Sequence, residues 1–125
     1  MERYHYRGST PKRWVVYDSR VHGDVTVEYA ELDSDGYPVG EAIFREPEHV
    51  ATRASSLAEV ADAWLADPPS GPWDLSKGYE RRFGGVCDQP IQSWDPHVIA
   101  ACVDVHRDEF ERVWREARAQ LESRP

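Results

Sequence analysis

Apolar and polar positions alternate along the N-terminal half of the chain. Within residues 25–32, valine and tyrosine alternate with polar or small residues, which is the period of a strand with one buried face. Runs rich in β-branched and aromatic residues at 13–19 and 37–45 flank this segment, and turn-forming residues separate the three. We therefore predict a meander of three antiparallel strands. Pairing of the third strand is expected to begin near Val39, because Pro38 has no backbone N–H to donate.

Two other segments have the period of an amphipathic helix. Ser56 and Glu59 match the Ser-x-x-Glu capping box, and an apolar stripe follows them as far as Leu65. A second helix is predicted from about residue 107 to residue 123, with acidic residues near its start and arginines later, the order that the helix dipole favours. Its expected buried stripe consists of Phe110, Val113, Trp114, Ala117 and Leu121.

The rest of the C-terminal half is less regular. Residues 97–105 form a largely apolar run that fits a buried strand, with a helix as the alternative. Residues 73–96 hold aromatic side chains among Gly, Pro and Asp, so this segment either contains short helical turns or is a functional loop. We predict a single α+β domain over residues 1–125, in which an antiparallel sheet of three to four strands carries two helices packed on one face.

The charge is unevenly distributed. The chain has 125 residues and a formal net charge of −8, and residues 24–67 alone hold eleven acidic and two basic side chains. Such a surface repels phosphate backbones and attracts basic proteins, so we expect a basic protein partner and no nucleic acid. No apolar run has the length of a membrane span and no apolar signal region begins the chain, so we expect no membrane and a cytoplasmic location.

The acidic stretch ELDSDG at 31–36 has some features of a calcium loop. If Gly36 occupied position 6 of an EF-hand loop, position 12, which requires a glutamate, would be Ala42. The flanking segments are predicted strands, whereas an EF-hand has flanking helices. We therefore interpret Asp35–Gly36 as a hairpin turn with Gly36 at positive φ, and we expect no metal site.

No residue carries a clear catalytic signature. None of the five histidines lies four residues from another on a predicted helix, as a metal pair would require. Cys87 lies in a glycine-containing loop with His97 downstream, so a pocket at this segment could assemble a Cys–His pair. No cofactor fingerprint is found, so we expect no cofactor and no catalytic residue, and the sequence favours a protein that is not an enzyme over one that is. Cys87 and Cys102 are expected to be reduced thiols.

Tryptophans provide candidate anchors for a partner. Trp14, Trp64 and Trp114 fall on the faces of predicted elements and are expected in the core. Two others lie in the irregular segment, where they could anchor either a satellite core or an interface. We predict a partner-binding surface made of the acidic hairpin and nearby aromatics. Its residues are Glu28, Glu31, Asp33, Asp35, Tyr37, Glu41, Trp73 and Trp94.

The segments VEYAELDSDGYPVGEAIFREPE and VDVHRDEFERVWREA resemble a family of small bacterial, mainly actinobacterial, proteins of uncharacterised function. The matching residues are Glu31, Leu32, Asp33, Asp35, Gly36, Phe44, Glu109, Phe110, Glu111 and Trp114. The resemblance covers about residues 25–65 and the closing helix, and residues 73–96 depart from it as an insertion. It implies a strand hairpin and a C-terminal helix, no catalytic residues, and a companion-protein role, since some members are encoded near toxin systems.

These observations favour a protein-binding function. We expect an immunity protein or inhibitor that neutralises a basic toxin enzyme, because an acidic inhibitor gains association rate towards a basic enzyme. Two alternatives remain open. One is a small enzyme or ligand-binding domain whose pocket lies at residues 73–97, with Cys87, His97 and aromatic walls. The other is an accessory protein of a phage or a biosynthetic cluster. The sequence predicts no particular oligomeric state.

Overall fold

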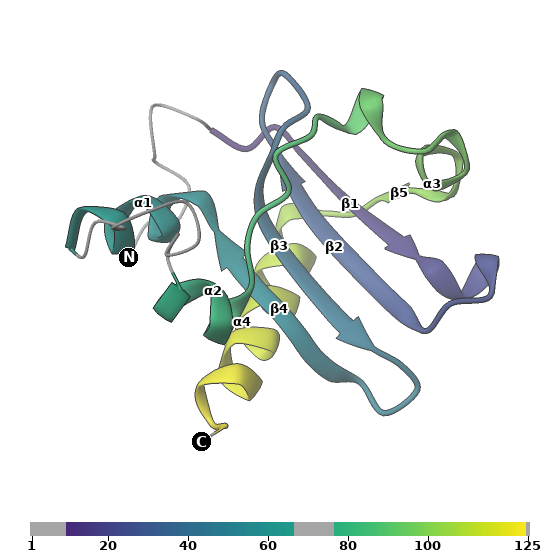
Figure 1. The fold of residues 1–125 in the computed structure, drawn as a ribbon. Coiled ribbons are helices and arrows are strands. Elements are labelled where there is room, and N and C mark those ends of the chain that lie inside the picture. The colour runs from purple at the N-terminus through teal and green to yellow at the C-terminus, as the bar shows by residue number, and fades with distance from the viewer. Residues whose placement is uncertain (1–9, 67–76, 125) are drawn as a thin grey trace.

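Five antiparallel strands form one sheet in the order β4-β3-β2-β1-β5 (Figure 1). This computed structural model describes residues 10–66 and 77–124, with the side chains of 64–66 and 77 excepted. The strands are β1 (Arg13–Asp18), β2 (Thr26–Leu32), β3 (Pro38–Arg45), β4 (Val50–Ser56) and β5 (Val103–Asp104). The helices are α1 (Leu57–Ala66), α2 (Lys77–Phe83), α3 (Pro96–Ala101) and α4 (Arg107–Glu122), with 3-10 turns η2 (Ser19–His22) and η4 (Ile91–Ser93).

The predicted meander is confirmed as β1, β2 and β3. Val15 in β1 pairs with Ala30 in β2, and both point to the same apolar cluster. The third strand begins one residue earlier than expected, because Pro38 pairs with Leu32. A register shift between Glu31 and Leu32 accompanies this pairing and accommodates the missing backbone donor.

The sheet is larger than the three to four strands predicted, because β4 and β5 extend it on both sides. The sequence of β4, VATRASS, has small residues where an amphipathic strand would have large ones. Ala51 and Ala54 are nevertheless fully buried, since α4 lies against them. The run 97–105 was expected to be a buried strand or a helix. Most of it forms the helix α3, which confirms the alternative, and the rest contains the two-residue strand β5, in which Val103 is 60% exposed.

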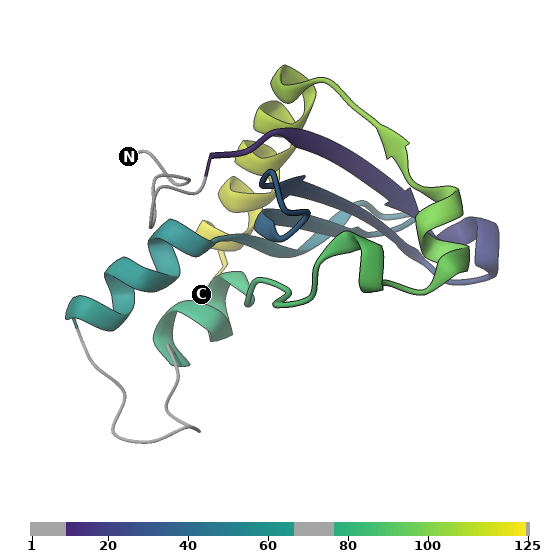
Figure 2. The same ribbon diagram turned by 90° about the horizontal axis from the view of Figure 1, so that it is seen from above.

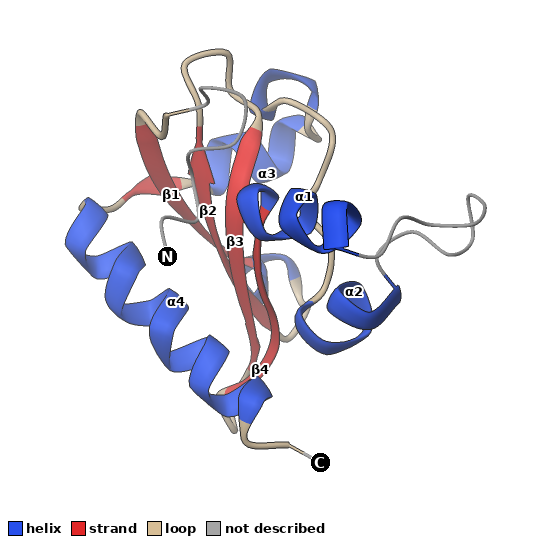
Figure 3. Ribbon diagram, turned by 90° about the vertical axis from the view of Figure 1, so that its left-hand side faces the viewer, coloured by secondary structure: helices blue, strands red, loops and turns tan. Residues whose placement is uncertain are grey.

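One face of the sheet is covered by α4. All five residues of the predicted stripe on α4 are buried, and they pack on β3 and β4 side chains that include Ala42 and Phe44. The prediction of two helices on one face is wrong in detail. Among the described helices, α4 crosses this face, whereas α1 and α2 lie beside β4 and α3 lies on the opposite side (Figures 2 and 3).

A buried ionic network joins α1 and α2 to α4. Ser56 caps α1 as predicted, by accepting a hydrogen bond from the backbone N–H of Glu59. The Glu59 carboxylate turns away from the cap and accepts hydrogen bonds from Arg118 and Tyr79. The apolar stripe predicted on α1 is only half-buried over its described side chains, because Ala58 and Glu59 hold the buried positions.

Within the described ranges, no helix combines the length and hydropathy that a membrane span requires.

Candidate functional site

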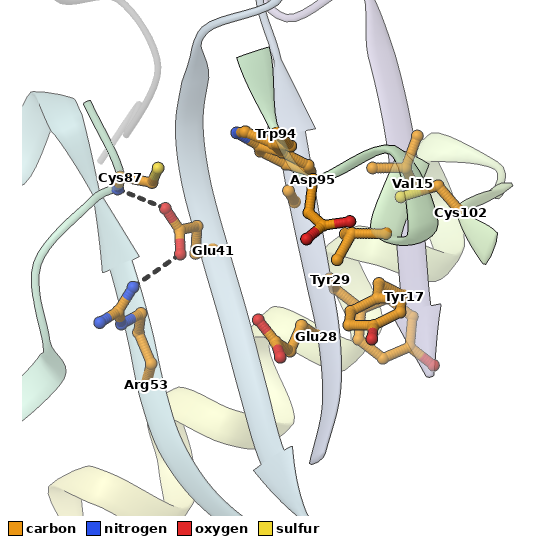
Figure 4. A pocket seen from close by; sticks show the side chains of 12 residues that line it. Val15, Tyr17, Glu28, Tyr29, Glu41, Arg53, Cys87, Trp94, Asp95 and Cys102 are labelled. Atoms are coloured by element: carbon orange, nitrogen blue, oxygen red, sulfur yellow. Dashed lines mark hydrogen bonds and ion pairs between the residues drawn. The ribbon is translucent and has the colours of Figure 1, made fainter. Parts of the chain in front are cut away.

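A hollow of about 430 Å³ lies on the sheet face opposite α4, between the sheet and residues 87–102 (Figure 4). We call this side of the sheet the open face. Apolar atoms of Val15 and Ala30 form part of the hollow's floor, and Val98 and Cys102 close one end. The indole of Trp94 forms another wall and is fixed by a hydrogen bond of 3.0 Å from its Nε1 to the carbonyl of Gln89. This volume lies within the usual range of ligand sites.

The chain segment that borders the hollow is attached to β4 and β3 by side-chain hydrogen bonds. Gly84 ends α2 at φ +85°, and a Cβ there would lie 2.8 Å from Arg53 Cγ, so glycine makes room for the arginine. Ser55 Oγ donates to the carbonyl of Gly85 at 2.7 Å, and the N–H of Cys87 donates to Glu41 at 2.5 Å. Gly84 therefore makes room for Arg53, while backbone groups of Gly85 and Cys87 dock this segment on the sheet.

The same segment also contacts the β2–β3 hairpin. The N–H of Ile91 donates to the carbonyl of Gly36 at 2.8 Å, and Gln92 Nε2 donates to the carbonyl of Asp35 at 3.0 Å. Gly36 has φ +86°, which confirms the predicted turn conformation. The Asp33 carboxylate accepts the N–H groups of Asp35 and Tyr37, so it stabilises the turn.

Three carboxylates line the hollow: those of Glu28, Glu41 and Asp95 (Figure 4). Glu41 is neutralised by Arg53, with 2.8 Å between Oε1 and Nη1. Glu28 accepts a hydrogen bond from Thr26 Oγ1, and Asp95 accepts one from the N–H of His97 as the N-cap of α3. Among the described residues, neither of these two carboxylates forms an ion pair.

The carboxylates of this region affect the pKa of Tyr17, which also lines the hollow. Partial burial raises the pKa of the Tyr17 hydroxyl, and the nearby carboxylates of Glu28, Asp24 and Asp95 raise it further. Burial likewise raises the pKa of the Cys102 thiol. These groups are therefore uncharged near neutral pH, and the open face offers hydrogen-bond donors and carboxylates to a ligand.

The predicted partner-binding residues are distributed over three places. Glu28, Glu41 and Trp94 line the hollow. Asp33, Asp35 and Tyr37 lie at the hairpin turn, where Tyr37 is 44% exposed. Glu31 is 0% exposed and accepts a hydrogen bond from Trp14 Nε1 at 3.1 Å, which corrects the expectation that it belongs to an exposed surface. Trp73 lies outside the described residues, as does the side chain of Trp64.

Of the two residues predicted to form a pocket, Cys87 and His97, the structure places only Cys87 at the hollow. Cys87 lines the hollow, but His97 is exposed on α3 and is absent from its described lining. The His97 ring instead lies edge-on to that of His22, with 6.1 Å between centroids, and His22 Nδ1 is hydrogen-bonded to the Tyr17 hydroxyl at 2.7 Å. The described residues include no group of three or more His, Cys, Asp or Glu placed to hold a metal ion.

Tyr17, Arg53 and Asp95 line this site but were not predicted from the sequence. The sequence around Asp95 does predict a helix start, since Asp-Pro at 95–96 is typical of an N-cap followed by a first-turn proline. That signal predicts α3 but not its position over the sheet. Arg53 and Tyr17 lie on strands with no distinguishing motif.

Comparison with known proteins gives no relative: no family model, no curated protein and no solved structure matches this chain. The resemblance to a family of small bacterial proteins therefore stays a prediction.

Proposed function

We propose that this protein binds a basic protein partner through the open face. The observation that carries the proposal is the pair of carboxylates, Glu28 and Asp95, that face the same hollow without a cationic partner among the described residues. A cationic surface would gain two ion pairs there without displacing an existing one. The net charge of −8 would accelerate the encounter with such a partner.

The class of partner that we propose is a basic toxin enzyme, which this chain would neutralise as an immunity protein or inhibitor. Charge and an aromatic anchor support this proposal. Carboxylates mainly increase the association rate, while an aromatic anchor such as Trp94, once a partner covers it, mainly slows dissociation. The hairpin residues Asp35 and Tyr37 would extend the contact beyond the hollow, because η4 joins the hairpin to the same segment.

Affinity capture with matched variants tests this proposal. The test variant combines Glu28→Gln with Asp95→Asn, since glutamine keeps a hydrogen-bond acceptor for Thr26 and asparagine still caps α3. The control is Glu109→Gln, which removes an exposed carboxylate from α4 on the other face. A basic protein retained by the wild type and the control, but lost from the double variant, is the expected result. A partner retained equally by all three would contradict binding through the open face.

Kinetics then separate the hollow from the hairpin. Once a partner is identified, the double variant should slow association by about tenfold at low salt and by less at high salt. Asp35→Lys tests the hairpin without disturbing the turn, because the Asp35 side chain is exposed and the turn is held by Asp33. Surface plasmon resonance on both variants shows which of the two surfaces attracts the partner.

A second candidate is a small ligand-binding domain or enzyme that uses the same hollow. The observation that favours it is the apolar floor and the Trp94 wall, which suit a small molecule as well as a side chain. A thermal-shift screen of small cations and neutral metabolites, repeated on Glu28→Gln, distinguishes this function. Stabilisation by a neutral compound that does not depend on Glu28 would favour the second candidate.

A further inference from the structure

We propose that the hollow on the open face receives one arginine side chain of the partner. This inference rests on the proposed function and names the group that the site would recognise. The lining of the hollow combines apolar side chains on the sheet, the indole of Trp94 and the carboxylates of Glu28, Glu41 and Asp95. An arginine has matching parts, since its aliphatic stem packs on apolar surface while its guanidinium pairs with carboxylates.

The carboxylates come from different elements, which determines how a cation would be held. Glu28 projects from β2, and Asp95 is the N-cap of α3; both side chains line the hollow (Figure 4). A guanidinium presents five N–H donors in a plane, so it can donate to two carboxylates on different sides at once. Trp94 offers the aromatic surface over which such a planar cation is stabilised.

The ion pair between Glu41 and Arg53 limits where the cation would lie. Both oxygens of Glu41 are occupied, one by Arg53 Nη1 and the other by the N–H of Cys87. Within the described part of the chain, that end of the hollow therefore has no unpaired carboxylate for a second cation. The guanidinium is therefore expected at the Glu28–Asp95 end, near Tyr17 and Val98, and the stem against Val15 and Ala30.

The molecule contains an arginine in a comparable environment within its own core. The guanidinium of Arg118 lies 3.8 Å from the ring centroid of Phe83 and 4.4 Å from that of Trp114, and it donates to the Glu59 carboxylate. That arrangement shows how an aromatic wall and a carboxylate together hold a guanidinium in this fold. The hollow offers the same two kinds of group from residues that face solvent.

The test is an NMR titration of the full chain with N-acetyl-arginine amide, followed through the indole N–H of Trp94. The matched neutral probe is N-acetyl-citrulline amide, which has almost the same shape without the charge. The lysine analogue tests the preference for a planar cation. The arginine probe is expected to saturate with a dissociation constant on the order of 1 mM, as for a small ligand with few contacts. Glu28→Gln and Asp95→Asn should each weaken it by about threefold or more, and Glu109→Gln should not.

Each outcome has a defined meaning. Equal binding of the citrulline or the lysine probe, or shifts that map away from Trp94, would overturn the arginine assignment. If a basic partner depends on Glu28 and Asp95 but the arginine probe does not bind, this inference fails and the proposed function stands. If the probe binds as expected but no partner depends on these carboxylates, the proposed function fails, and with it the partner as the source of the arginine. Replacing single arginines of an identified partner by lysine should locate one position whose loss matches that of Glu28→Gln.

Discussion

Arg118 and Glu59 meet across 59 residues of sequence through two hydrogen bonds, of 3.0 and 2.5 Å, between guanidinium and carboxylate. Tyr79 donates to the same carboxylate at 2.7 Å, and Arg118 also donates to the carbonyl of Ala54 in β4. Four elements, α1, α2, α4 and β4, therefore converge on one ion pair. Burial opposes the ionisation of Glu59, but the hydrogen bonds from Arg118 and Tyr79 outweigh it and hold the pKa of Glu59 below its ordinary value.

Breaking this pair should be costly, whereas replacing both members should not. Arg118→Met leaves a buried carboxylate without its cation, and we expect the free energy of unfolding to fall by about 3–5 kcal/mol. The double variant Arg118→Met with Glu59→Met should recover most of that loss, because it leaves no isolated charge. Urea denaturation measures both values. A loss below about 1 kcal/mol in Arg118→Met would mean that the network contributes little to stability.

The turn between β3 and β4 should make stability depend on pH through His49. One hydrogen bond to Glu46, at 2.8 Å, outweighs partial burial and raises the pKa of His49, and Glu116 raises it further. Because the folded-state pKa is raised, this contribution is fully present below the ordinary value of about 6.5 and is lost as pH rises through the folded-state pKa.

His49→Asn tests this pH dependence, since His49 has φ 59° and asparagine tolerates that conformation. Loss of the ring stacked on Phe44 should lower the melting temperature at every pH. The difference between variant and wild type should be largest below about pH 6.5 and should shrink above the raised pKa. Thermal melts from pH 5 to pH 9 measure it, and a difference that does not change with pH would contradict the role of the two glutamates.

Gly40 makes room for the buried Glu31. The two residues are register partners in β3 and β2, and a Cβ on Gly40 would lie 2.6 Å from Glu31 Oε1. We expect Gly40→Ala to cost about 1–3 kcal/mol through overpacking. Combining it with Glu31→Ala should remove the clash, so the double variant should lose less than the sum of the two single losses. Strictly additive losses in chemical denaturation would show that the strand relaxes by another route.

Truncating Trp114 on α4 should be costly. Its side chain is 7% exposed, packs in the core, and donates from Nε1 to the carbonyl of Ser55 at 3.1 Å. Trp114→Ala should lower the free energy of unfolding by about 3–5 kcal/mol. Trp114→Phe keeps an aromatic ring near Arg118 and loses the hydrogen bond, so it should cost about 1–3 kcal/mol. If Trp114→Ala and Trp114→Phe had the same free energy of unfolding, packing of an aromatic ring at this position would not explain the loss of stability.

The sequence predicts those parts of the fold that depend on local periodicity. The stripe from Phe110 to Leu121 is buried at each predicted position, because a helix of this length repeats one face several times. β4 has no such signal, since the burial of Ala51 and Ala54 depends on α4, which follows much later in the chain. The predicted capping box is likewise confirmed only at Ser56, because the partner of Glu59 is distant in sequence. Ser56 caps the helix locally, but Glu59 is drawn to an arginine that the local pattern does not contain.

The site was harder to predict than the fold. The sequence shows that many acidic residues lie near the hairpin, but it does not show where their side chains point. Glu31 points into the protein, Asp33 holds its own turn, and Glu28 opens on the hollow. Asp95 joins Glu28 only because η4 docks on the hairpin and places α3 over β1. That contact is tertiary, and no spacing in the sequence encodes it.

The late position of α4 has a consequence for the protein during its synthesis. β4 ends at Ser56 and α4 begins at Arg107, so the four-stranded part of the sheet leaves the ribosome well before the helix that covers it. At roughly 5–20 residues per second, the gap of about fifty residues takes roughly 3–10 seconds. For that time Phe44, Ala42 and Ala54 have no helix over them. The nascent chain thus presents an apolar sheet surface to chaperones, and conditions that slow translation after β4 should increase aggregation of this protein.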